Sequence, residues 1–62
     1  METLRKVIKD RDNIDDAEFD FLVQEAFDAL KGGEDPDDVL RDVFSIEPDF
    51  VFHLLAEVEK LI

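Results

Sequence analysis

The hydrophobic residues of this chain recur with helical spacing, and the clearest pattern spans residues 15–31. Apolar positions there follow one another at i, i+3, i+4, i+7, i+8 and i+11, which places them along one stripe of a helix with a period of 3.6 residues. The stripe consists of Phe19, Leu22, Val23, Ala26, Phe27 and Leu30. We predict that this segment forms the central helix, against which the remaining segments pack.

Both ends of the central helix are marked by residues suited to them. Asp15 is a favourable N-cap, and Glu18 stands at the position where a capping box has its acidic residue. Lys31 suits the negative end of the helix dipole. Gly32 and Gly33 follow, so a left-handed residue can end the helix there.

Three shorter segments complete the pattern. Residues 3–11 carry a narrow apolar edge. A second helix start is marked by Asp35 as cap with Pro36 in the first turn, and a third is marked by Pro48. The last segment has an unusually wide apolar face of about 140°, against about 100° for a simple surface helix. This face includes Phe50, Val51, Leu54, Leu55, Val58, Leu61 and Ile62.

No strand pattern competes with these helices, because the sequence has no sustained apolar–polar alternation and no Asn-Gly hairpin turn. A chain of 62 residues is also the length of one domain. We therefore predict an all-α fold, a single compact domain of three to four short helices over residues 1–62. The expected helices span about 3–11, 15–31, 36–44 and 48–62.

The passage from Ala29 through Gly32 and Gly33 to Asp35, Pro36 and Leu40 resembles the connection between the second and third helices of ubiquitin-associated domains. The resemblance covers less than a third of the chain. The Met-Gly-Phe/Tyr loop that carries recognition in that family has no counterpart in this sequence. No function is therefore transferred from the family.

Charge is the strongest anomaly of the composition. Eighteen acidic residues against seven basic ones give a net charge of −11, with +2 over residues 1–11, −12 over 12–49 and −1 over 50–62. Such a field repels nucleic acid and anionic membranes and steers a protein towards basic partners. Solubility alone is the simpler explanation of the charge. The basic stripe of Arg5, Lys6 and Lys9 is expected to dock on the chain's own acidic surface.

The location of the protein is inferred from what its sequence lacks. No cysteine is present, which fits a reducing compartment. The longest apolar runs are three residues, too short for a membrane span. The sequence has no basic segment followed by an apolar stretch, which is the pattern typical of a secretory signal. We expect a cytoplasmic protein that contacts neither membrane nor nucleic acid.

Catalysis and metal binding find little support. The chain has one histidine, one serine and no cysteine or tyrosine. A chain this short also has few residues with which to enclose a catalytic pocket. His53 is expected to be an exposed residue in i,i+4 contact with Asp49 and Glu57. The run from Asp10 to Asp16 fails the calcium-loop template. We expect no enzyme activity, no cofactor and no metal site.

A protein-binding surface is the leading functional prediction. Phe21 projects about half a turn away from the apolar stripe, given roughly 100° per residue. One large apolar group among charges is typical of an interface anchor. The alternative is that the first helix or a neighbouring loop covers Phe21. We predict that a basic partner binds the face formed by Asp20, Phe21, Gln24, Glu25 and Asp28.

Two alternatives remain open at this point. The wide face of the last helix suits a structural homodimer or assembly subunit, which exposure of Val51, Leu55 and Ile62 would favour, and Phe52 is a second exposed candidate. A mimic of nucleic acid is the other alternative. Carboxylates of Asp16, Asp20 and Asp28 fall on one face in steps of about 6 Å along the axis, although Gln24 interrupts the row.

Overall fold

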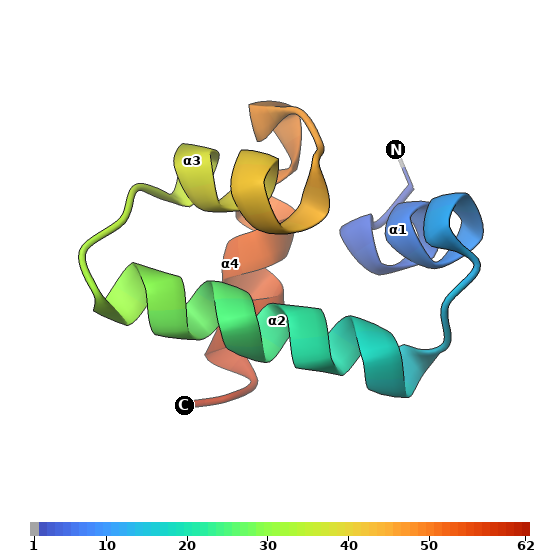
Figure 1. Cartoon of the computed structure of the whole chain (residues 1–62), viewed down its shortest axis with the longest axis horizontal. Helices are drawn as coiled ribbons and strands as arrows, with labels where there is room; N and C mark the ends of the chain where they lie inside the picture. The colour runs from blue at the N-terminus through green and yellow to red at the C-terminus, as the bar shows by residue number, and fades with distance from the viewer. Residues whose placement is uncertain (1) are drawn as a thin grey trace.

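The computed structural model describes residues 2–62, which form four helices and no strand (Figure 1). The all-α class predicted from the sequence is confirmed. The helices are α1 (Leu4–Asp12), α2 (Asp16–Lys31), α3 (Pro36–Val39) and α4 (Val51–Glu59).

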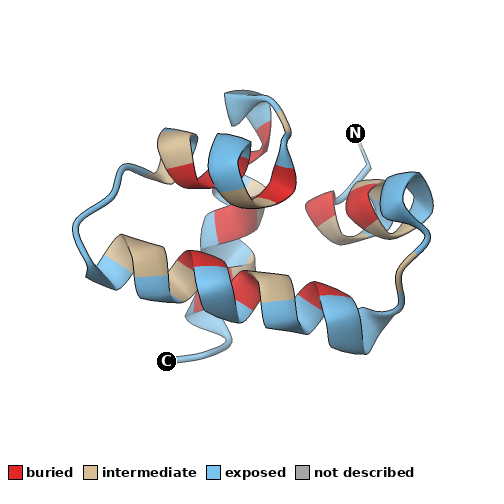
Figure 2. Cartoon of the chain, in the orientation of Figure 1, coloured by how far each residue is buried: buried red, intermediate tan, exposed pale blue. Residues whose placement is uncertain are grey.

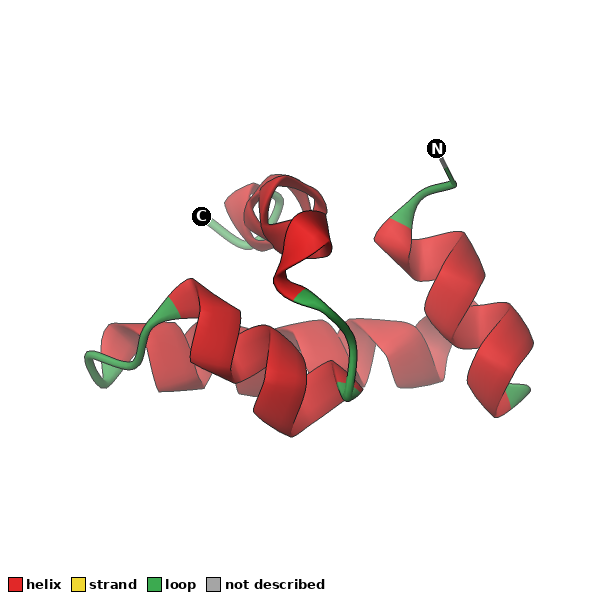
Figure 3. Cartoon of the chain, turned by 90° about the horizontal axis from the view of Figure 1, so that it is seen from above, coloured by secondary structure: helices red, strands yellow, loops and turns green. Residues whose placement is uncertain are grey.

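The long helix α2 runs along the length of the molecule, and the other helices pack against it (Figure 1). α3 and the turn after it lie over one half of α2, and α1 lies over the end where α2 begins. α4 passes behind α2 and is seen almost end-on in the view from above, so the two helices cross steeply (Figure 3). This arrangement brings α1 and α4, at opposite ends of the sequence, onto the same helix.

The first two helix starts have side-chain caps, whereas Asp35, predicted as the cap of the next helix, stands at the N-cap of α3 without a side-chain capping bond. The Thr3 side chain accepts a hydrogen bond from the Lys6 backbone N–H at 3.2 Å and begins α1. Asp15 accepts from the Glu18 backbone N–H at 2.9 Å and begins α2, as predicted. Asn13, at a φ of 54°, ends α1 in the left-handed conformation, and Gly33 does the same after α2 at a φ of 98°. An Asn and a Gly are the residues that accept this conformation at least cost.

The third predicted helix, residues 36–44, is not one regular helix. The α-helical turn Pro36–Val39 passes into a π-helical turn, Leu40–Phe44, which ends at Ser45 with a φ of 52°. A π-helical turn holds one more residue than an α-helical turn. The change of pitch accompanies burial of Leu40 and Phe44 from this short segment. The apolar spacing of residues 36–44 does not indicate this turn.

The last predicted helix, residues 48–62, is shorter and begins differently. Pro48–Phe50 forms a 3₁₀ turn, and α4 follows and ends at Glu59. The backbone N–H groups of Lys60, Leu61 and Ile62 donate to the carbonyls of Glu57, Val58 and Glu59 at 3.2, 2.9 and 3.3 Å. These bonds span three residues instead of four, so the chain tightens after Glu59 and does not continue as an α-helix.

The core lies between α2 and the other elements, where the buried positions face one another (Figure 2). The rings of Phe19 and Phe44 meet there with centroids 5.8 Å apart. Phe27 was expected in the stripe but is only half-buried, with the Lys31 ammonium 5.1 Å from its ring centroid. The fully buried side chains are led by Phe19, Phe44, Leu4, Ile8, Leu40, Leu54 and Val39.

Candidate protein-interaction surface

Arg5 joins α1 to the two helices beside it. Its Nε and Nη2 donate to the two carboxylate oxygens of Glu57 in α4, at 3.2 and 3.0 Å. Its Nη1 donates to Asp16 Oδ1 at 3.0 Å and its Nη2 to Asp20 Oδ1 at 2.8 Å, both in α2. The guanidinium also lies 4.7 Å from the centroid of the Phe19 ring. Planar bidentate pairing of this kind is specific to arginine.

These contacts shift the pKa values of the carboxyl groups that Arg5 meets. Burial alone would raise the pKa of Glu57, but hydrogen bonds from Arg5 and Lys60 outweigh it and hold that pKa below its usual value. Lys9, at 2.9 Å, and then Arg5 lower the pKa of Asp16. Arg5 and Lys9 therefore dock on the chain's own acidic surface, as predicted, whereas Lys6 pairs with Asp10 within α1.

The docking of α1 divides the predicted partner-binding face. Asp20 is held by Arg5, so its carboxylate is already engaged within the molecule. Gln24 donates from Nε2 to Asp28 Oδ1 at 3.3 Å, which orders the next turn of the helix. Among residues 2–62, Glu25 and Asp28 take part in no ion pair. Within the predicted face, the carboxylates open to a partner are therefore Glu25 and Asp28, in the part of α2 after Asp20.

Phe21 stands in the open beside these carboxylates. Its side chain is 64% exposed, and neither α1 nor a loop covers it. Phe21 and Phe52 are the two exposed phenylalanines, and the other four are buried or half-buried.

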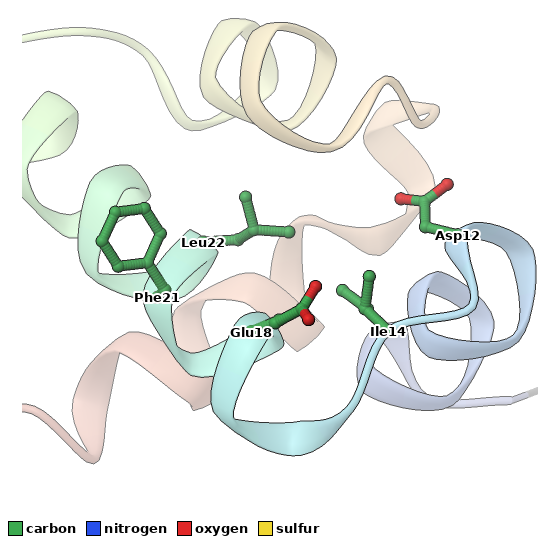
Figure 4. A pocket seen from close by; sticks show the side chains of 5 residues that line it. All are labelled: Asp12, Ile14, Glu18, Phe21 and Leu22. Atoms are coloured by element: carbon green, nitrogen blue, oxygen red, sulfur yellow. The ribbon is translucent and has the colours of Figure 1, made fainter.

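A groove of about 270 Å³ adjoins Phe21 (Figure 4). Ile14 and Leu22 are the half-buried apolar residues along it, and Phe21 and Asp12 stand at its two ends. Glu18 lies at its edge and is exposed. Sequence reasoning missed this groove because Asp12 and Ile14 reach it only through the fold of the loop before α2. The sequence feature that could have indicated the groove is Leu22, an apolar residue at the margin of the stripe. Glu18 and Glu25 lie before and after it along the chain.

His53 was predicted to be an exposed residue in i,i+4 contacts, and that prediction is wrong. Its Nδ1 accepts a hydrogen bond from the Leu4 backbone N–H at 3.1 Å, and its ring meets Phe50 edge-on with centroids 5.5 Å apart. Glu57 bonds instead to Arg5. His53 therefore supplies an acceptor to the first turn of α1 from the opposite end of the chain.

The outer side of α4 carries a second hydrophobic surface. Phe52 is 79% exposed, and Leu55 is also exposed. A hollow of about 330 Å³ lies beside Phe52, lined by Thr3, Leu4, His53, Ala56, Glu57 and Lys60. The residues of this surface are different from those around Phe21.

Two further findings concern the described residues as a whole. Over residues 2–62, no group of three or more acidic or histidine side chains is placed to hold a metal ion. Within the same range, every helix is too short or too polar to cross a lipid bilayer. Comparison of the chain with protein-family models, curated proteins and solved structures finds no match.

Proposed function

We propose that this protein is a non-catalytic interaction module that binds a basic protein partner through the outer face of α2. The observation that carries the proposal is Phe21, exposed among carboxylates and adjoined by an apolar groove. Aromatic anchors of this kind supply most of the energy of an interface, and charge supplies fast encounter. The binding face contains Asp20, Phe21, Gln24, Glu25 and Asp28, together with the groove beside them.

The size of the groove favours a side chain over a small molecule. Its volume of about 270 Å³ falls below the range of about 300–1,000 Å³ that is usual for ligand pockets. The described residues also include no strand, so an extended peptide finds no sheet edge to pair with. The groove and the length of α2 suit a partner helix laid along α2, with one apolar side chain in the groove.

The open carboxylates indicate where the partner's basic residues belong. Glu18 and Glu25 flank Leu22 on the same side of α2, seven positions apart in the sequence. That separation corresponds to about 10 Å along a helix. A partner helix with a large apolar residue and a Lys or Arg about one turn away on each side matches this spacing.

The nucleic-acid mimic is less well supported by the same geometry. Its row consists of Asp16, Asp20 and Asp28, and the first two are paired with Arg5 and Lys9. A mimic needs its charges open to the basic groove that it enters.

The absence of cysteine fits a reducing compartment, and we include a cytoplasmic location in the proposal.

The test uses a designed helical peptide with a central leucine and a lysine about one turn before and after it. A scrambled peptide of the same composition, with leucine and lysines on opposite faces, is the control probe. Titration of the ¹⁵N-labelled protein is expected to shift the backbone signals of Ile14, Phe21, Leu22 and Glu25 with the first peptide. Affinity should fall as salt rises, because steering by charge is screened.

Variants separate the anchor from the charge. Phe21→Ala should weaken binding about tenfold or more, mainly through faster dissociation, while the circular dichroism spectrum stays unchanged. Glu25→Gln with Asp28→Asn should mainly slow association, and Glu34→Gln with Asp42→Asn is the matched control for loss of two charges elsewhere. Equal binding of both peptides, or binding indifferent to Phe21→Ala, contradicts the proposal.

A further inference from the structure

The outer side of α4 is the most apolar exposed surface of the described residues. Four of the five large hydrophobic side chains that are exposed lie there or just after the helix: Phe52, Leu55, Leu61 and Ile62. Exposed hydrophobic residues that gather in this way mark interaction sites more often than scattered ones do. The fifth, Phe21, belongs to the separate surface on α2.

This surface carries both a projection and a hollow. Phe52 projects with 79% of its surface exposed, and the hollow of about 330 Å³ begins beside it. Leu4, His53 and Ala56 form part of the hollow's lining. The hydrogen bond from the Leu4 N–H to His53 Nδ1 and the edge-on contact of His53 with Phe50 hold its wall in place. The hollow is therefore preformed in the isolated chain.

A surface that holds a projection beside a hollow is able to complement itself. In a dimer with two-fold symmetry the same patch meets its own copy, so each residue contact occurs twice. A second chain turned about an axis near Ala56 brings its own Phe52 to the hollow of the first chain. The same rotation brings the first Phe52 to the second hollow.

The charge distribution leaves this face available to a second copy of this chain. Two molecules with a net charge of −11 repel each other over most of their surfaces. The hollow differs, because Arg5 and Lys60 neutralise Glu57 within it. Residues 50–62 carry only −1, against −12 over residues 12–49. Two copies that meet about a two-fold axis therefore repel each other less at α4 than at the acidic residues 12–49.

We propose that this face forms a symmetric homodimer in which Phe52 of each chain enters the hollow of the other. A specific interface buries at least about 1,000 Å² in total, or about 500 Å² per chain. That amount is about one eighth of the 4020 Å² accessible surface of this chain. An interface built on Phe52, Leu55, Ala56 and the residues after α4 belongs at the small end of this range. Such a dimer leaves Phe21 open.

Sedimentation equilibrium over a wide range of protein concentration tests the dimer directly. Wild type should associate to dimers and no further, and association should strengthen as salt screens the repulsion between copies. Phe52→Ala should weaken dimerisation about tenfold or more, because an exposed aromatic anchor is lost without harm to the core. Phe21→Ala, which removes the other strongly exposed phenylalanine, is the matched control and should leave dimerisation unchanged.

A mixing experiment tests the pairing of projection and hollow. Ala56→Gln places a longer side chain in the hollow without changing the net charge, so it should also weaken self-association. A mixture of Phe52→Ala and Ala56→Gln chains keeps one intact pair, since Phe52 of one variant meets the open hollow of the other. The mixed dimer should therefore be tighter than either variant's own dimer.

Several outcomes overturn this proposal. A chain that stays monomeric up to millimolar concentration at moderate salt excludes it. A dimer that is unaffected by Phe52→Ala, or a mixture no tighter than the separate variants, excludes the assigned interface. Peptide binding at α2 is measured on different residues and falls with salt, so either result stands without the other.

Discussion

At the scale of single residues, Arg5 is the charged side chain that links α1 to both α2 and α4. It meets carboxylates of both α2 and α4 and lies over the ring of Phe19. The sequence predicted that basic residues of the first helix would dock on acidic ones. It did not identify Glu57, because that residue is 52 positions away and spacing along the chain carries no information about such a partner.

Arg5→Ala should lower the free energy of unfolding by roughly 1.5–3 kcal/mol, the range for hydrogen bonds to charged groups whose partner is left desolvated. Glu57 would be that partner, since its side chain is only 11% exposed. Urea denaturation followed by circular dichroism measures the change. Lys6→Ala is the control: Lys6 pairs with Asp10 on the surface, where a pair contributes about 0–1 kcal/mol. Equal losses from the two variants would show that Arg5 acts only as a surface charge.

At the scale of elements, local chemistry predicted where helices begin better than what happens inside them. Asp15 and Pro36 mark starts that the structure confirms. The π-helical turn at Leu40–Phe44 was missed, because a hydrophobic stripe of nine residues fits either pitch. The role of His53 was missed because its partner, Leu4, belongs to another helix. Tertiary contacts determine these features, and such contacts cannot be inferred from a local window of sequence.

The candidate site also combines features that the sequence predicted with features that depend on the fold. The outward direction of Phe21 follows from the angle between successive residues of a helix, and its exposure in the structure agrees with that direction. The engagement of Asp20 by Arg5 and the groove at Ile14 depend on how α1 packs on α2. Sequence spacing therefore predicted the exposed anchor, and the fold determined which neighbours it has.

The link between α1 and α4 should weaken in acid. Because the folded-state pKa of Glu57 lies below its ordinary value of 4.5, its contribution to stability is fully present above that value. The contribution is lost as the pH falls through the folded-state pKa, where Glu57 gains a proton and the pair with Arg5 ends.

The difference in unfolding free energy between wild type and Glu57→Gln isolates this effect from the general repulsion among carboxylates. Urea denaturation of both chains from about pH 7 to about pH 3 should give a difference that is constant in the upper part and shrinks below about pH 4.5. Glu59→Gln, on the exposed side of the same helix, should show a small difference at every pH. A Glu57→Gln difference that does not change with pH would show that the carboxylate charge contributes nothing there.

At the scale of the whole molecule, two electrostatic effects oppose each other. Six basic residues are paired with carboxylates (Arg5, Lys6, Lys9, Arg11, Arg41 and Lys60), and Lys31 lies over Phe27. These attractions favour the fold and weaken with salt. Eighteen acidic residues against seven basic ones leave a large excess of negative charge, whose repulsion opposes the fold and also weakens with salt.

Repulsion should be the larger effect, so the melting temperature should rise as sodium chloride increases from low to moderate concentration. Most of the ion pairs are exposed and contribute about 0–1 kcal/mol each, whereas the excess charge acts over the whole of a small chain. The measurement is best made on the Phe52→Ala chain, so that salt-dependent dimerisation does not add to the shift. Sucrose at matched osmolality separates charge screening from general solute exclusion.

Removing two open carboxylates with Asp37→Asn and Asp42→Asn should raise the melting temperature at low salt and reduce its dependence on salt. A melting temperature that stays constant or falls with salt would mean that the contacts of α1 already outweigh the repulsion, and the acidic excess would then act only on association with other molecules.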